Sequence, residues 1–209
     1  MGCDIHTLLE KKCYDGSCWN NVDYWQYTYD EDSSYKLRLI DFYDDRNYEL
    51  FSVLADVRNY QDLEYICEPK GMPEDCSKET QDYIDSWGLD GHSHSYFTIK
   101  ELYDYWLEMP TTIKRNGILI GEILEKFDKT GEEPTEWCRG CSTPEKHEWR
   151  EWEVEYNPLD RFMNALIDRF CKEFWLFYVD EKEYKTSEKL RKFVDDNGDK
   201  FRVVFFFDN

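Results

Sequence analysis

The sequence predicts a single α+β domain over residues 1–209, with a mainly antiparallel sheet whose N- and C-terminal strands are central and whose helices pack on it. Residues 3–12 alternate as a strand does. Residues 201–207 (FRVVFFF) are apolar on both alternating faces except at Arg202, which is typical of a strand covered on both sides. The segments between them carry helical spacing, and no stretch has the composition of a linker.

The strand over residues 3–12 is expected to place Asp4 and His6 on one side. Asp15-Gly16 is typical of a hairpin turn, and residues 19–29 supply aromatic strand formers behind it. If the first and last strands are neighbours, Asp208 lies close to Asp4 or His6.

Helices are predicted where apolar residues recur at helical spacing between start and stop signals. The expected helices run from Asp44 or Asp45 to about Val57, from Ser77 to Gly88, from a Thr98/Glu101 capping box to Pro110, from Asn157-Pro158 through Phe174, and from Lys185 to Val194.

The chain carries a net charge of −20, from 26 basic and 46 acidic side chains. A field of this sign disfavours direct binding to polymeric nucleic acid or to anionic membranes. It fits simple solubility, and it also fits an acidic surface that imitates DNA and blocks a host protein. The first residues show no apolar run, so secretion is not expected, and the eight cysteines are expected to be reduced thiols or metal ligands in the cytoplasm.

Two short segments rich in aspartate and histidine are the best candidates for chemistry. They supply Asp4 and His6 in the first, and Asp90, His92 and His94 in the second. Residues two apart on an extended backbone point to the same side, so each segment can bind a divalent metal such as zinc or manganese. The sequence does not establish that any cofactor is bound. Asp4, His6 and His92 would then be catalytic in phosphoester hydrolysis. The alternatives are a hydrogen-bonded structural pair or a polar ligand pocket without metal.

A nucleotide site is a further interpretation of the same region. Arg46, Asn47 and Tyr48 fall in the first turn of a predicted helix, where exposed N–H groups beside a guanidinium attract anions. The hydroxyl donors and stacking rings expected to complete the ligand site are Ser93, Ser95, Trp87 and Tyr96. The alternative is that Arg46 only balances neighbouring aspartates.

Two close pairs of cysteines are present, Cys13 with Cys18 on the predicted hairpin and Cys138 with Cys141 in a CxxC. Together they predict a structural zinc site, with His147 as a substitute ligand. Unligated thiols are the alternative.

Several motifs, spread over both ends of the chain, resemble an uncharacterised family of bacteriophage proteins. They are Met1-Gly-Cys-Asp-Ile-His6 with Glu10, Asp45-Arg-Asn-Tyr48, Leu50-Phe51, Leu54-Ala-Asp-Val-Arg-Asn59, Gly71-Met-Pro-Glu-Asp-Cys-Ser77, Trp87, Asp90-Gly-His-Ser93 with Ser95, Thr98, Glu101-Leu102, and Val203-Val-Phe-Phe-Phe-Asp-Asn209. His94 departs from this pattern, and the CxxC lies outside it. The resemblance implies a viral accessory protein in the cytoplasm of the infected bacterium, of the kind that disarms host defences.

The leading expectation is therefore a phage accessory protein that binds a small phosphate-bearing nucleotide in an Asp/His pocket, by sequestration or by cleavage. The alternatives are a metal-dependent phosphodiesterase and an acidic, DNA-mimicking protein that blocks a host factor. The sequence leaves the oligomeric state open.

Overall fold

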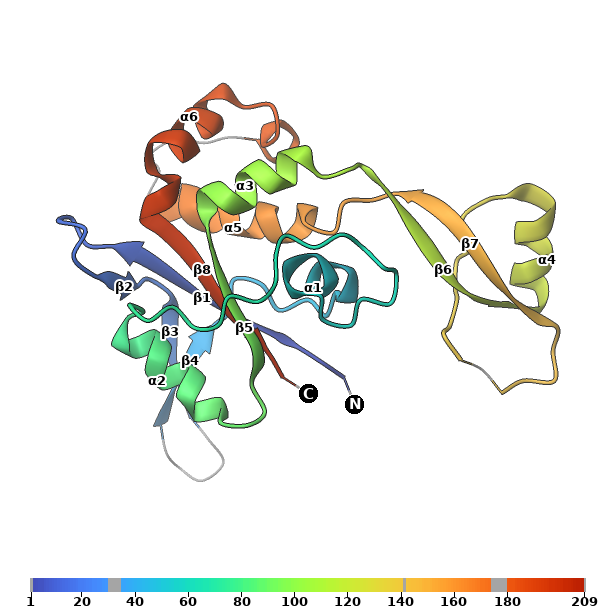
Figure 1. Cartoon of the computed structure of the whole chain (residues 1–209), viewed down its shortest axis with the longest axis horizontal. Coiled ribbons are helices and arrows are strands. Elements are labelled where there is room, and N and C mark those ends of the chain that lie inside the picture. Colours follow the sequence, from blue (N-terminus) through green and yellow to red (C-terminus); the bar gives the residue numbers. More distant parts are fainter. Residues whose placement is uncertain (1, 30–34, 141, 174–179, 209) are drawn as a thin grey trace.

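A four-stranded antiparallel sheet lies at the centre of the computed structural model, which describes residues 2–29, 35–140, 142–173 and 180–208. Its strand order is β2-β1-β8-β5, where β2 is Trp19–Asn21, β1 is Ile5–Lys12, β8 is Phe201–Phe207 and β5 is His92–Thr98 (Figure 1). The first and last strands are thus the two inner strands. This confirms the predicted fold class.

Strand β8 is buried along its whole length, because both faces of the sheet are covered. Val203, Phe205 and Phe207 point into the larger core. This core is built with α1 (Tyr48–Ala55), α3 (Ile99–Glu108), α5 (Asp160–Glu173) and α6 (Glu188–Asn197). Val204 and Phe206 point to the other face, against α2 (Lys78–Trp87). Each buried phenylalanine contributes roughly 1.5–3 kcal/mol, so this strand holds both layers together.

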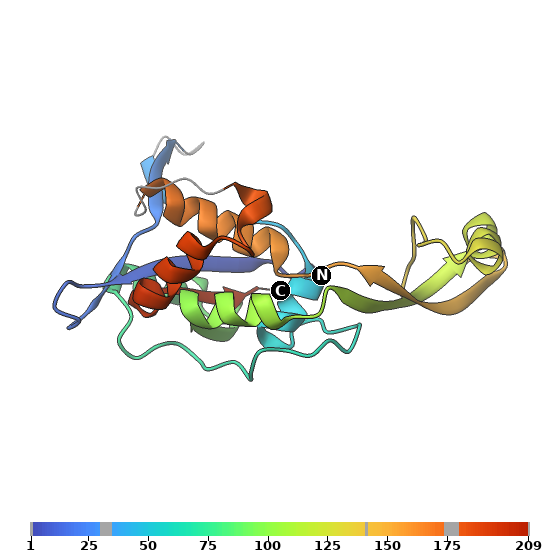
Figure 2. The same cartoon turned by 90° about the horizontal axis from the view of Figure 1, so that it is seen from above.

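Two hairpins extend from this body. The smaller one joins β3 (Tyr24–Tyr29) to β4 (Tyr35–Ile40). The larger one joins β6 (Thr112–Ile120) to β7 (His147–Glu155) and carries α4 (Gly121–Thr130) near its far end. Figures 1 and 2 show this second hairpin projecting from the body as an arm. The helices and strands predicted from the sequence include none of the arm's elements.

The arm has a small core of its own, made by Leu119, Leu124 and Trp152. It is attached to the body at its base by polar contacts. The Arg115 guanidinium donates to Glu49 of α1 at 2.7 and 2.9 Å, and the Asn116 N–H donates to the Gln61 side chain at 2.9 Å. These contacts place the arm beside α1.

Most of the residues predicted to cap or end a helix do so in the structure. Ser77 caps α2 and Gly88 ends it, and the capping box of Thr98 and Glu101 opens α3. The α1 start differs, because the Asn47 side chain accepts from the N–H groups of Glu49 and Leu50 and so replaces Asp44 or Asp45 as the cap.

The ends of the last two helices also differ from prediction. Helix α6 begins after its Ser187 cap rather than at Lys185, and it continues past the predicted Val194 to Asn197. Helix α5 begins at Asp160, and the predicted Phe174 lies outside the described residues. Two short 3₁₀ turns, Glu181–Glu183 and Gly198–Lys200, complete the described elements. In the described ranges, none of the helices combines the length and apolar character that a membrane span needs.

Candidate functional site

The two Asp/His segments meet at β8, where His94 contacts the same Phe206 ring as His6, whereas His92 lies on the other face of the sheet. His6 pairs with Phe206 of β8, whereas His92 pairs with Phe207. Neighbouring residues of a strand point to opposite faces, and the ring contacts agree: His6 lies 4.8 Å from Phe206, and His92 lies 6.1 Å from Phe207. The predicted pocket of His6 and His92 is therefore wrong. A bulge between His92 and Ser95 sets this register.

The first segment forms an ion-paired group at the end of β1. Asp208 accepts from the Asp4 N–H at 2.8 Å and lies 3.3 Å from His6 Nε2, which confirms the predicted neighbourhood. Arg46 donates to both carboxylate oxygens of Asp4 at 2.6 Å. These hydrogen bonds hold the pKa of Asp4 below its usual range. Both carboxylate oxygens of Asp4 are thus engaged by the Arg46 guanidinium, which is typical of a structural ion pair.

The second segment is divided between the two faces. The His94 ring stacks on Phe206 at 5.4 Å, on the face of α2, and burial lowers the pKa of this histidine. His92 Nδ1 contacts the Ser93 hydroxyl at 3.0 Å on the opposite face. Asp90 is exposed in the turn before β5. Across the residues that the structure describes, no three His, Cys, Asp or Glu side chains are placed to hold one metal ion.

The side chains expected to stack or bind a nucleotide beside these histidines already have protein partners. The Trp87 ring lies 4.1 Å from His6, and the buried Ser95 hydroxyl accepts from the Lys70 N–H. Tyr96 packs in the core against α2. Ser93 takes the left-handed bulge conformation, with φ of 51°. None of these four predicted ligand residues lines the pocket between α1 and the arm that is described below.

The four cysteines do not form a zinc site together. Cys13 and Cys18 are joined by a disulfide in the β1–β2 hairpin, with 5.4 Å between their Cα atoms. This contradicts the expectation of reduced thiols at this pair. Cys138 is a free thiol whose backbone pairs with Ile118 of the arm. Figures 1 and 2 show the arm at the opposite end of the molecule from the β1–β2 hairpin. Cys141 lies outside the described residues, and His147 is exposed at the start of β7.

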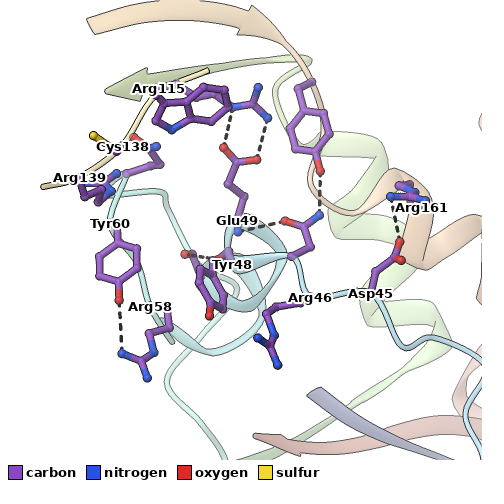
Figure 3. A pocket seen from close by; sticks show the side chains of 15 residues that line it. Asp45, Arg46, Tyr48, Glu49, Arg58, Tyr60, Arg115, Cys138, Arg139 and Arg161 are labelled. Carbon is purple, nitrogen blue, oxygen red and sulfur yellow. Dashed lines mark hydrogen bonds and ion pairs between the residues drawn. The ribbon is translucent and has the colours of Figure 1, made fainter. Parts of the chain in front are cut away.

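A pocket of about 800 Å³ lies between α1 and the arm, and it includes the predicted Arg46, Asn47 and Tyr48. We call it the arginine pocket. Its cationic side chains are Arg46, Arg58, Arg115, Arg139 and Arg161, and its rings are Tyr48, Tyr60, Trp137 and Tyr156 (Figure 3). The carboxylates among its lining residues are Asp45 and Glu49. The size and the mixture of rings and charges are those of small-molecule sites.

The first turn of α1 does not supply the free N–H groups that the sequence analysis expected. The Asn47 side chain already accepts from the N–H groups of Glu49 and Leu50, both at 3.1 Å. The Asn47 carbonyl accepts from Phe51. The Glu49 carboxylate in this turn would also repel an anion. Any attraction for anions in the pocket therefore comes from its guanidinium groups.

Three of the five guanidiniums are bound to carboxylates. Arg115, which is 13% exposed, forms its two hydrogen bonds with Glu49 and a third with Glu133 at 3.0 Å. Arg46 pairs with Asp4, as described above. Arg161 lies 2.9 Å from Asp45, and both are largely open to water. These pairs neutralise much of the pocket's charge.

Arg58 and Arg139 have no carboxylate partner within hydrogen-bonding distance in the described part of the chain. Arg58 contacts the Tyr60 hydroxyl at 3.3 Å. The Arg139 guanidinium lies 5.0 Å from the centre of the Tyr60 ring, and partial burial lowers its pKa. Figure 3 shows Tyr60 between these two arginines. In a chain of net charge −20, two such cations beside one ring are the most anion-attracting feature of the pocket.

The rings of the pocket are held by packing. Trp137 lies against Gly117 of β6 so closely that a Cβ there would meet the indole at 2.7 Å. The Arg115 guanidinium stacks on both Trp137 and Tyr156, at 5.3 and 4.8 Å from the ring centres. Tyr60 remains 45% exposed. A planar ligand thus finds ordered aromatic surface beside cationic groups.

Sequence reasoning missed most of this pocket. It identified the 46–48 segment, but Arg58, Tyr60, Arg115 and the residues around Arg139 come from three distant parts of the chain. No local spacing connects them. The CxxC motif identified Cys138 as a candidate zinc ligand, but it did not identify the neighbouring Arg139 as a pocket residue.

In comparisons with protein-family models, with curated proteins and with solved structures, no match to this chain was found. The resemblance to a bacteriophage family accordingly stays a prediction from the sequence motifs.

Proposed function

We propose that this protein binds a small phosphate-bearing nucleotide in the arginine pocket and withholds it from other proteins. The observation that carries the proposal is the gathering of five arginines and four aromatic rings around one pocket in a strongly acidic chain. Guanidinium groups recognise phosphate, and the rings offer faces on which a base can stack. The site is displaced from the Asp/His pocket first expected, but the class of ligand is the same.

Capture is favoured over cleavage by the state of the acidic side chains. Glu49 and Asp45, which line the pocket, are both held in ion pairs with arginines. Both oxygens of Glu49 accept from Arg115, so this carboxylate is poorly placed to take a proton from an attacking water. Binding without turnover is therefore the simpler activity for these residues.

The sequence resemblance extends the proposal to a biological setting. We propose that the protein serves a bacteriophage as an accessory, anti-defence protein in the cytoplasm of the infected cell. A chain that sequesters a nucleotide signal needs affinity for it but no catalytic group, and a preformed pocket can supply that affinity.

Isothermal titration calorimetry tests the ligand class directly. The panel consists of mononucleotides, cyclic nucleotides and ADP-ribose-type nucleotides, with the corresponding nucleosides as matched controls that lack phosphate. We expect binding of at least one nucleotide and much weaker binding of its nucleoside. Silence across the whole panel, for folded protein, would refute the proposal. Mass spectrometry of small molecules released from protein purified from bacteria provides an independent measurement.

A second function, blocking a basic host protein, is favoured by one face of the arm. Glu151, Glu153 and Glu155 alternate along β7 and are all exposed, which forms a row of like charges. A host DNA-binding protein should then be retained in a salt-sensitive manner. Replacing the three glutamates by glutamine should abolish this retention, and Arg58→Gln should leave it unchanged. Equal retention by all variants would argue against this function.

A further inference from the structure

We infer that Asp23 and Asp41 form a pH-sensitive hinge at the root of the β3–β4 hairpin, which holds the hairpin on the body at acid pH and releases it toward neutral pH. Asp23 directly precedes β3, and Asp41 directly follows β4. Figure 1 shows this hairpin on the side of the body away from the arm. The described lining of the arginine pocket includes no hairpin residue, so the hinge is independent of the proposed nucleotide binding.

The two aspartates lie on the same face of the hairpin. Trp25 of β3 pairs with Leu39 of β4. Asp23 stands two residues before Trp25, and Asp41 stands two residues after Leu39. Residues two apart on an extended chain point to the same side. Both carboxyl groups therefore point toward the face of the hairpin that packs on the body.

The face that carries the aspartates is apolar and only partly covered. The Trp25 ring contacts Tyr83 of α2, with 5.9 Å between ring centres, and Leu39 packs against the smaller core. The next pair on this face, Tyr27 with Leu37, is exposed. Opening at the root would add Trp25 and Leu39 to this exposed apolar surface. The root is thus the point at which the hairpin is attached to α2.

Asp23 is buried among groups that partly satisfy it. Its Oδ2 accepts from the Leu9 N–H at 2.9 Å and from the Asn21 amide at 2.7 Å. The Arg169 guanidinium of α5 donates to the neighbouring Val22 carbonyl at 2.6 Å. Burial nevertheless raises the pKa of Asp23 to about 7, against the effect of these hydrogen bonds and of the Arg169 charge. The closed root therefore favours the protonated carboxyl.

Asp41 has fewer partners than Asp23. Its Oδ1 is buried and has no hydrogen-bond partner in the described part of the chain. Burial raises the pKa of Asp41, the charge of His6 lowers it, and the charge of Asp44 raises it. The two aspartates also act on each other's surroundings, because the charge of Asp41 raises the pKa of Asp23, and both charges add to the effect of burial on Tyr83. Ionising either carboxyl is thus disfavoured while the root is closed.

The direction of the pH effect follows from these pKa values. The closed hairpin keeps the Asp23 proton up to about pH 7, whereas water returns the pKa of the carboxyl to its ordinary value of 3.8 in the open hairpin. Opening should therefore become easier as the pH rises from about 4 to 7, by about tenfold per pH unit, and should level off above pH 7. Asp41 acts in the same direction.

Hydrogen exchange of the full chain, followed by NMR at pH 5, 6 and 7, measures this opening once each rate is divided by the intrinsic rate at that pH. We expect the amides of β3 and β4 to lose protection by about tenfold per pH unit. They should exchange faster than the amides of β8. Their exchange should also respond little to low concentrations of urea, since a local opening exposes little surface.

Three variants identify the groups responsible. Asp23→Asn should remove most of the pH dependence, because the amide does not ionise and can still accept from the Leu9 N–H. Asp41→Asn should raise the protection of the hairpin at pH 7, because the second charge is then absent. Asp15→Asn is the matched control, since this exposed carboxylate lies in the β1–β2 turn and accepts from Ser17.

Faster exchange of the hairpin than of β8, with a pH dependence that is lost in Asp23→Asn and kept in Asp15→Asn, supports the hinge. Protection of β3 and β4 that stays constant between pH 5 and 7, or that changes equally in Asp23→Asn, overturns it. Exchange at the rate of β8, with the same response to urea, also overturns it, because the hairpin then opens only with the whole sheet. If Asp23→Asn fails to fold, protection at pH 7 that is unchanged in Asp41→Asn overturns the hinge.

Discussion

Replacing Arg202 by methionine is expected to reduce the free energy of unfolding by about 3–5 kcal/mol, because it leaves a buried carboxylate without its cation. Arg202 lies on β8, and its side chain is 4% exposed. It donates from Nε to Glu10 at 2.7 Å and from Nη1 to Asp75 at 2.7 Å. Glu10 is fully buried, and its other oxygen accepts from the Ser77 N–H. The pair therefore joins the sheet to the start of α2.

The loss of unfolding free energy depends on which partner of the Arg202–Glu10 ion pair is replaced. Without Arg202, Glu10 keeps only the Ser77 N–H for a charge that is out of water. Glu10→Gln should cost less, because the amide still accepts from Ser77 and the guanidinium still pairs with the largely exposed Asp75. A loss of 3–5 kcal/mol is a large share of the roughly 5–15 kcal/mol that stabilises a typical domain.

Urea denaturation followed by tryptophan fluorescence and circular dichroism measures these differences. The double variant Glu10→Gln/Arg202→Met should be more stable than Arg202→Met alone, since the buried charge is then absent. Arg150→Met, on the exposed arm, is the control and should change stability little. A loss below about 1 kcal/mol for Arg202→Met, or a double variant less stable than both single variants, would contradict the reasoning.

Three further changes have defined outcomes. Burial raises the pKa of Asp23 to about 7 from an ordinary value of 3.8. The folded state therefore binds the carboxyl proton of Asp23 more tightly than the unfolded state does. As a result, the free energy of unfolding should fall as the pH rises from about 4 to 7. Asp23→Asn should remove up to about 4 kcal/mol of that dependence in urea titrations at several pH values; an unchanged slope would contradict the assignment. Gly117→Ala should displace Trp137 and weaken nucleotide binding in calorimetry with little change in circular dichroism, whereas unaltered affinity would show that this ring is not used. Alkylation of the unreduced, denatured protein should spare Cys13 and Cys18, and labelling of all eight cysteines would refute the disulfide.

The sequence was sufficient for the elements whose signals are local. The alternating pattern of residues 3–12 and the apolar run at 201–207 predict two strands at the centre of the sheet, which the structure confirms. Caps at Ser77 and Thr98 are short-range hydrogen bonds, so their residue types reveal them. The proximity of Asp208 to His6 follows once the two strands are neighbours.

The site was harder to predict because it depends on register and on distant contacts. The bulge before Ser95 turns His92 to the face opposite His6, and no spacing rule reveals one extra residue in a strand. Arg58 and Arg139 both contact Tyr60 because the arm is attached to α1 at its base through Arg115 and Glu49. Strand β7 (HEWREWEVE) has its two tryptophans three residues apart and charged residues between them, so it lacks the regular apolar alternation that predicts a strand.

The position of β8 between β1 and β5 has a consequence for how the molecule is made. During synthesis, β5 emerges with no strand to pair with until residues 201–207 have left the ribosome, and β1 has only the short β2. The apolar faces of both layers therefore stay uncovered until late, which makes partly folded chains prone to aggregate. A chain that stops before Phe201 should be recovered as an aggregate, whereas one that reaches Phe207 can complete the sheet.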